Sequence, residues 1–255
     1  MEIAVLIKRV PMVGGRIALD PTGQAVDTSG LGFTISPHEE CAVEEAVRIV
    51  EKHGGSVTVV TLGGPEAAEQ LRDTVAVGAN DLVLLEAGTS RFGPMATADA
   101  LSAEIARAES EKGGPFDLVL AGNEAADSGD YQVAVRLAKL LGRPCATGIK
   151  GIEILDDAIS ARREYRGVEE RFELRLPAVV SVKEGINLPR YPSLPGRMRA
   201  RKAPIATFEP LWHDEALTMT TLSVPKVDRR SAEVLGRGAQ AVPALVAILE
   251  ELGAL

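Results

Sequence analysis

The chain has 255 residues, of which 45% are hydrophobic and 25% charged, as in one large globular domain or a domain with an appended arm. Its formal net charge of −8 argues against bulk nucleic-acid binding. No apolar run approaches the roughly 20 residues that cross a bilayer, and the first ten residues are too short and strand-like for a signal peptide. These features predict a cytoplasmic protein with no direct membrane insertion and no nucleic-acid partner.

Strands and helices alternate along the first part of the chain. Short runs rich in Val, Ile and Leu, apolar on both faces, are typical of strands in a covered parallel sheet, and they lie at 2–10, 56–63, 81–87 and 116–123. Helices are expected at 37–52, 64–79, 93–113 and 128–142. The first begins with Ser36 as N-cap, Pro37 at the first helical position and Glu39 completing a capping box. This alternation predicts an α/β fold with a doubly wound, mostly parallel sheet.

The pattern changes after residue 145. Polar and apolar residues alternate in 159–166 and 169–176, which predicts antiparallel strands with one solvated face. A buried strand ending at Val182 is followed by an arm with three prolines, which cannot stay in a central strand because proline lacks an N–H donor. We therefore expect an α/β nucleotide-binding domain with an antiparallel extension, a projecting arm that recognises a partner, and a C-terminal tail with one closing helix, at 1–182, 183–202 and 203–255.

The segment 120–133 is the strongest candidate for a ligand site, because ligands of open parallel sheets bind beyond the carboxyl ends of the strands. The N–H groups of 128–131 are expected at a helix start, where they would hold a phosphate, and Gly122 would let a base approach the backbone. Lys8 and Arg9 follow the first strand and add cations at the same edge. Plain structure is the alternative for the loop, and solvated surface for the two cations.

Enzyme and metal signatures are absent from the sequence, which has no nucleophile elbow, Walker A loop or His-Glu-x-x-His motif. The three histidines and two cysteines lack metal-ligand spacing, so we predict no metal and no catalytic residue. His53 and His213 are expected at the surface, and Cys41 and Cys145 as reduced thiols in the core. His38 differs, because it lies in the first turn of a helix that would point at a ligand.

Several segments together resemble the β subunit of electron transfer flavoprotein. They are AVLIKRVP, SPHEECAVEEAVRI, VTLGGPEAAEQLRDTVAVGAND, DLVLAGNEAADSGDYQV and LRLPAVVSVKEGINLPRYPSLPGRMRARK. The resemblance runs almost continuously from residue 2 to about 204, the last segment is the most specific, and the tail is similar only loosely. It implies a sheet of the adenine-nucleotide α-hydrolase-like kind.

The resemblance also implies a function. Such a β subunit pairs with an α subunit that holds most of one redox-active FAD, and it buries an AMP, or in bifurcating relatives a second FAD, in its own cavity. The dimer takes electrons from flavoprotein dehydrogenases and passes them to a quinone reductase or another acceptor. The chain would be an electron carrier rather than a catalyst with its own substrate, and its tail would pack on the α subunit.

The sheet-edge argument and the resemblance together predict two groups of site residues. The cofactor contacts are Leu6, Lys8, Arg9, Ser36, Pro37, His38, Glu39, Leu62, Gly63, Gly122, Asn123, Glu124, Ala125, Asp127, Ser128, Gly129, Asp130, Tyr131, Gln132 and Val133. The partner-recognition residues, with Leu188 as the apolar anchor, are Lys183, Ile186, Asn187, Leu188, Pro189, Arg190 and Tyr191.

The sequence departs from the family pattern at several positions. Ser36 stands where Asn is common, His38 where an aromatic often follows the proline, and Glu124 where Gln is usual. Glu124 adds negative charge beside the expected nucleotide, so AMP, a second FAD and an empty site all remain open.

Three other functions are weighed against the electron carrier. A non-flavin adenine-nucleotide-binding regulator would form an ATP-binding homodimer, but a glycine-rich phosphate loop is missing. An adenylating enzyme would need a Ser- and Gly-rich loop after the first strand, and KRVPMVGGR does not supply it. A nucleic-acid binder would use the cations of the arm, but the chain is acidic and poor in aromatic residues.

Overall fold

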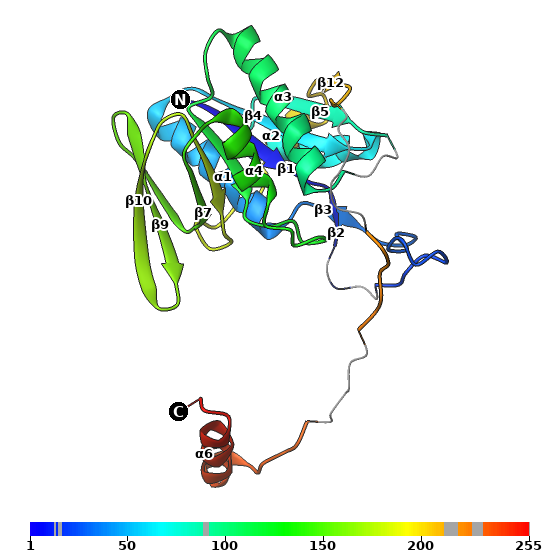
Figure 1. Ribbon diagram of the computed structural model, residues 1–255, viewed down its shortest axis with the longest axis vertical. Helices are drawn as coiled ribbons and strands as arrows, with labels where there is room; N and C mark the ends of the chain where they lie inside the picture. The colour runs from blue at the N-terminus through cyan, green and yellow to red at the C-terminus, as the bar shows by residue number, and fades with distance from the viewer. Residues whose placement is uncertain (13, 15–16, 89–91, 212–218, 226–231, 255) are drawn as a thin grey trace.

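The computed structural model describes residues 1–12, 14, 17–88, 92–211, 219–225 and 232–254 (Figure 1). Its centre is a seven-stranded sheet with the order β12-β5-β4-β1-β6-β11-β7, in which all paired strands are parallel. The strands are β1 (Glu2–Ile7), β4 (Ser56–Gly63), β5 (Asp81–Glu86), β6 (Leu118–Gly122), β7 (Cys145–Ile149), β11 (Ala178–Val182) and β12 (Ala206–Phe208). The predicted α/β class with a doubly wound parallel sheet is confirmed.

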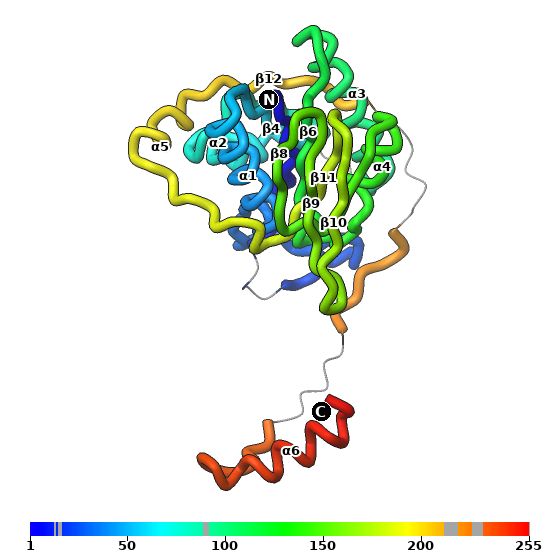
Figure 2. The backbone as a smooth tube through the Cα atoms, turned by 90° about the vertical axis from the view of Figure 1, so that its left-hand side faces the viewer, coloured from blue at the N-terminus to red at the C-terminus, as the bar shows by residue number. Residues whose placement is uncertain are grey.

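Two layers of helices cover the sheet. The helices are α1 (Pro37–His53), α2 (Ala68–Val77) after a 3-10 turn η1 (Pro65–Ala67), α3 (Pro94–Lys112) and α4 (Val133–Leu141). Ile3 and Val5 of β1 pack in one core with α1 and α2, whereas Ala4 and Leu6 pack in a second core with α3 and α4. Figure 2 shows the two pairs of helices on opposite sides of the sheet. Because both faces are buried, the strands are continuous apolar runs rather than alternating ones.

A second, three-stranded antiparallel sheet forms the expected extension. It consists of β8 (Gly151–Ile154), β9 (Ala158–Tyr165) and β10 (Val168–Arg175). Much of β10 is exposed. Ion pairs connect β9 and β10, such as Arg163 with Glu170 at 2.7 Å. The chain then returns to the main sheet, where β11 lies between β6 and β7. Two further strands, β2 (Val10–Pro11) and β3 (Phe33–Thr34), form an antiparallel pair. They lie at the two ends of the long connection between β1 and α1.

The arm leaves the sheet as expected, but it does not project away from the domain. It crosses α1 and forms a short helix, α5 (Leu194–Ala200), that packs on α2. A Cβ atom at Gly196 would lie 2.4 Å from the carbonyl oxygen of Ala76, so only glycine permits this close packing. The backbone of the arm therefore lies against the domain, and only its outward-facing side chains project. The chain continues into β12, which extends the sheet beside β5.

The closing helix of the tail is α6 (Val242–Glu251), preceded by the 3-10 turn η2 (Gly238–Ala241). It lies apart from the α/β domain in Figures 1 and 2, and none of its residues is buried. His213 lies outside the described residues. Within the described ranges no helix combines the length and the apolar character that crossing a membrane requires.

Candidate functional site

A cavity lies where the strand order reverses. The chain runs outward from β1 to β4 and β5 and then returns to β6 on the other side of β1. Doubly wound sheets bind ligands outside the carboxyl ends of their strands at such a point. The cavity there has a volume of about 550 Å³, which is within the range of small-molecule and cofactor sites.

Most of the predicted cofactor contacts line this one cavity. They are Leu6, Lys8, Arg9, Glu39, Leu62, Gly63, Gly122, Asn123, Glu124, Ala125, Asp127, Ser128, Asp130, Tyr131, Gln132 and Val133. Four predicted residues do not line it, namely Ser36, Pro37, His38 and Gly129. The structure thus brings together segments that are far apart in the sequence.

The start of α1 is hydrogen-bonded to the loop after β6. The Ser36 hydroxyl donates to the carbonyl oxygen of Glu124 at 3.1 Å, and the Ser36 N–H donates to the Glu39 carboxylate at 2.9 Å. His38 Nε2 lies 3.6 Å from a carboxylate oxygen of Glu124. Ser36 and His38 therefore hold the loop in place rather than face the cavity.

Gly122 has a structural role as well as a place in the cavity lining. A Cβ atom there would lie 2.7 Å from Cγ of Glu39 and 3.2 Å from Cβ of His38, so the glycine makes room for the first turn of α1. Burial raises the pKa of Glu39 to about 8, although the N–H groups of Ser36 and Lys8 both donate to its carboxyl group. This carboxyl is consequently mostly neutral at pH 7.

The predicted helix start at 128 is wrong, because α4 begins only at Val133. Gly129 and Tyr131 have φ values of 59° and 57°, a left-handed conformation that a helix start cannot contain, and the Gly129 N–H donates to Ala125 at 2.9 Å. The backbone N–H groups that have no partner within a helix lie instead in the first turn of α4. The side chain of Gln132, the N-cap residue, does not accept a hydrogen bond from them. Gln132, Val133 and Ala134 line the cavity, so this helix end is the better place for an anion.

Charges of both signs line the cavity. Lys8 Nζ contacts Asp127 Oδ1 at 2.8 Å and links β1 to the loop after β6. The Arg9 guanidinium lies 3.3 Å from the ring centroid of Phe33, and its Nε is buried with no hydrogen-bond partner among the described residues. The lining carboxyl groups are Glu39, Glu66, Glu124, Asp127 and Asp130.

This lining fits an adenine nucleotide. An apolar wall that includes Leu6, Leu62 and Leu101 suits a base, and carboxylates are the usual partners of ribose hydroxyls. The open end of α4 and the two cations suit a phosphate. In the described part of the chain no cluster of three or more His, Cys, Asp or Glu side chains is suited to a metal ion.

The sequence-based reasoning missed several lining residues, among them Gly64, Glu66, Phe92, Thr97, Leu101, Ser181 and Met219. Ser181 had a detectable signal, because it is a polar residue in the otherwise apolar strand β11. Its hydroxyl donates to Asn123 Oδ1 at 3.0 Å and so fixes the start of the cavity loop. Met219 belongs to the tail, and no local pattern connects it with the cavity.

The fold and the cavity define a class, namely doubly wound α/β proteins with a candidate ligand site at the switch point of the sheet. Comparison with known proteins is more specific. The family model of the electron transfer flavoprotein domain matches residues 24–211.

Three proteins named electron transfer flavoprotein subunit beta illustrate the similarity. The one from Bacillus subtilis (strain 168) is 40% identical over 209 residues, which cover 82% of this chain and 79% of the relative. That from Syntrophomonas wolfei is 33% identical over 226 residues, covering 88% and 86%. That from Homo sapiens is 33% identical over 258 residues, covering 99% and 98%. This chain therefore belongs to the electron transfer flavoprotein family and groups with its β subunits.

Proposed function

We propose that the chain works as the β subunit of a heterodimeric electron transfer flavoprotein. It pairs with an α subunit and carries electrons from flavoprotein dehydrogenases to a quinone reductase or another acceptor, in the cytoplasm. One observation carries this proposal: separate segments of the chain, most of them within the residues that match the family model, gather around a single cavity at the switch point of the sheet. A carrier of this kind needs no nucleophile or proton-transfer pair, because the flavin supplies the redox chemistry.

The redox-active FAD would be held mainly by the α subunit. The cavity of this chain takes an adenine nucleotide, with its base against the apolar wall at Leu6 and Leu62 and its phosphate at Lys8 and the first turn of α4. The ribose hydroxyls face the carboxylates of the loop after β6. The nucleotide is AMP in a plain carrier, or the adenylate part of a second FAD in an electron-bifurcating complex.

The first part of the arm, residues Lys183 to Tyr191, is proposed to recognise the electron-donating dehydrogenase. Leu188 and Tyr191 are 90% and 95% exposed, which is unusual for side chains of this size. Large exposed apolar side chains are typical anchors of protein interfaces. Leu188 is the expected anchor, and the cations that follow Tyr191 steer the encounter.

The tail is proposed to pack on the α subunit. Val242, Leu245, Val246, Ile248 and Leu252 in and beside α6 are all exposed. An apolar helix that buries none of its side chains on its own domain needs another surface to cover it.

Co-purification with the α subunit tests the proposal. The chain would be co-expressed with an α subunit, and the flavin absorbance would be followed after adding a flavoprotein dehydrogenase and its substrate. We expect a one-to-one complex whose yellow absorbance is bleached by the dehydrogenase and restored by an electron acceptor. A flavin-free homodimer that binds ATP would instead support the alternative, a non-flavin nucleotide-binding regulator.

A further inference from the structure

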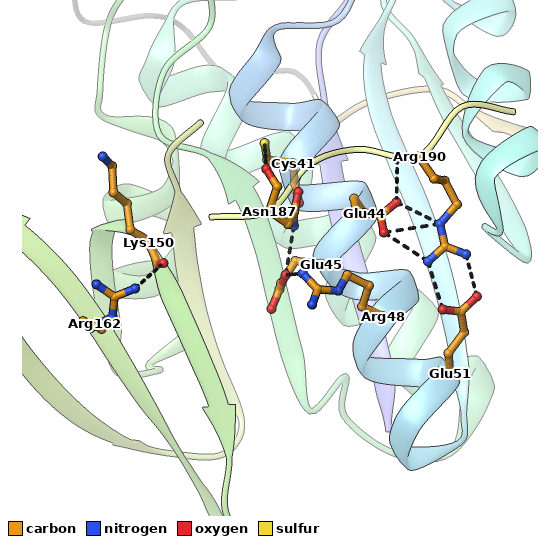
Figure 3. A network of polar contacts seen from close by, with 9 residues as sticks. All are labelled: Cys41, Glu44, Glu45, Arg48, Glu51, Lys150, Arg162, Asn187 and Arg190. Atoms are coloured by element: carbon orange, nitrogen blue, oxygen red, sulfur yellow. Dashed lines mark hydrogen bonds and ion pairs between the residues drawn. The ribbon is translucent and has the colours of Figure 1, made fainter. Parts of the chain in front are cut away.

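The arm is fastened to α1 through the side chain of Arg190 (Figure 3). Its Nε and Nη2 donate to the Glu44 carboxylate at 2.9 and 3.0 Å, and its Nη1 and Nη2 donate to Glu51 at 2.6 and 2.9 Å. The Arg190 backbone N–H also donates to Glu44, at 3.2 Å. One guanidinium therefore bridges two carboxylates that lie two turns apart on the same face of α1.

A second anchor lies three residues earlier in the arm. Asn187 Nδ2 donates to the carbonyl oxygen of Cys41 at 3.0 Å and to the Glu45 carboxylate at 2.9 Å. Asn187 and Arg190 thus both turn toward α1, as Figure 3 shows. The arm is held along the helix at two points rather than at its ends alone.

The exposed apolar residues of the arm alternate with these anchors. Leu188 directly follows Asn187, Tyr191 directly follows Arg190, and each is at least 90% exposed. Pro189 and Pro192 restrict the backbone between and after them. The two anchors therefore determine which way Leu188 and Tyr191 face.

The Glu44 contact is the stronger half of the Arg190 bridge. Glu44 is only 5% exposed, and a buried carboxylate that loses its cation is left with an uncompensated charge. The side chain of Glu51 is 55% exposed, so its pair with Arg190 contributes little. Arginine suits this place because its planar fork donates two hydrogen bonds to each of the two carboxylates, a geometry that a lysine ammonium does not offer.

We propose that Arg190 is a positioning residue for electron uptake, because its bridge to α1 presets the arm in the shape in which Leu188 meets the dehydrogenase. A segment that is already in its bound shape loses less conformational entropy on docking. This inference rests on the proposed role of the arm in recognising the donor. It adds that recognition depends on a residue that faces away from the partner.

The first test uses the co-expressed heterodimer and the flavoprotein dehydrogenase that reduces the wild-type complex fastest. We expect Arg190→Gln to raise the KM for the heterodimer about tenfold while kcat and flavin content stay unchanged. Arg190→Lys should recover part of the loss, because it restores the charge without the fork. Lys52→Gln is the matched control: Lys52 is an exposed cation in the last turn of the same helix, and its loss should change KM less than about twofold.

A double-mutant cycle with Leu188→Ala tests whether Arg190 affects KM through Leu188. If Arg190 acts by presenting Leu188, adding Arg190→Gln to Leu188→Ala should raise KM less than about threefold further. If the increase in KM of the double variant equals the product of the increases in the two single variants, the inference would be overturned. A normal KM for Arg190→Gln beside an impaired Leu188→Ala would also overturn it while leaving the docking role of the arm intact.

Hydrogen exchange of the backbone amides in 186–192 gives a readout that does not depend on the dehydrogenase. We expect faster exchange in the Arg190→Gln heterodimer than in wild type or Lys52→Gln. Unchanged exchange would contradict the fastening of the arm. A normal KM for Leu188→Ala would remove the proposed docking role itself, and the inference with it.

Discussion

The carboxyl group of Glu39 is where helix, loop and cavity meet. It accepts the Ser36 N–H, its Cγ lies where a side chain on Gly122 would be, and it forms part of the cavity wall. Burial raises its pKa to about 8, against an ordinary value of 4.5. A neutral carboxyl at this place removes one negative charge from beside the proposed phosphate.

Glu39→Gln should weaken the dependence of stability on pH. Because the folded chain keeps a proton on Glu39 that the unfolded chain releases, this group stabilises the fold below pH 4.5, and the contribution is lost as the pH rises through about 8. The free energy of unfolding, measured with urea across this range, should fall more for wild type than for Glu39→Gln. Glu153→Gln, an exposed carboxyl of β8, should keep the wild-type slope. Equal slopes for wild type and Glu39→Gln would contradict the assignment.

At single residues, local chemistry was predictable and long-range contacts were not. The capping residues Ser36, Pro37 and Glu39 were predicted because a helix start is a local pattern. The contact of Gly122 with the first turn of α1 was not predicted, because that neighbour is more than 80 residues away in sequence. Arg190 was expected to face a partner, yet its guanidinium turns toward α1.

At the level of elements, the starts of β4, α1 and α3 were predicted to within one residue, whereas the start of α4 was not. The strand β4 lies at the predicted residues, and the antiparallel sheet appears where polar and apolar residues alternate. The start of α4 was misplaced by five residues, because its preceding loop is fixed by distant partners such as Val182, which accepts the Asn123 N–H. The position of β11 between β6 and β7 likewise follows from pairing that no local pattern encodes.

The packing of α5 on α2 should depend on Gly196. In Gly196→Ala the new Cβ would meet the carbonyl oxygen of Ala76 at 2.4 Å, so α5 must move away from α2. We expect a loss of about 1–3 kcal/mol of stability and faster hydrogen exchange across 194–208, measured by urea unfolding and mass spectrometry. Gly114→Ala is the control, because its Cβ would meet no atom within 4 Å. Equal behaviour of the two variants would mean that α5 is held elsewhere.

In the whole molecule, three surfaces are kept separate. The cavity occupies the carboxyl edge of the main sheet, the arm crosses α1 and α2, and α6 lies apart from both (Figures 1 and 2). In the proposed function, this separation would allow one chain to hold a nucleotide, meet an electron donor and bind a second subunit at the same time. The first two surfaces were indicated by sequence motifs, whereas the tail resembles the family only loosely.

The charge-bearing variant Leu245→Asp should weaken binding to the α subunit without unfolding the α/β domain. Leu245 is 47% exposed on α6, so an aspartate there costs little in the free chain but would be buried unpaired in an interface. We expect at least a tenfold weaker association by analytical ultracentrifugation, with an unchanged melting temperature of the isolated chain. Glu251→Gln, at the polar end of the same helix, should associate normally. Normal association of Leu245→Asp would show that α6 does not contact the α subunit.

The most direct test of the account identifies the nucleotides that the denatured heterodimer releases. Chromatography should find one FAD together with one further adenine nucleotide for each complex. AMP as the second nucleotide would define a plain carrier, and a second FAD would define a bifurcating one, in either case held at the switch-point cavity. One FAD with no second nucleotide would contradict the assignment of the cavity, and the absence of any flavin would contradict the electron-carrying function.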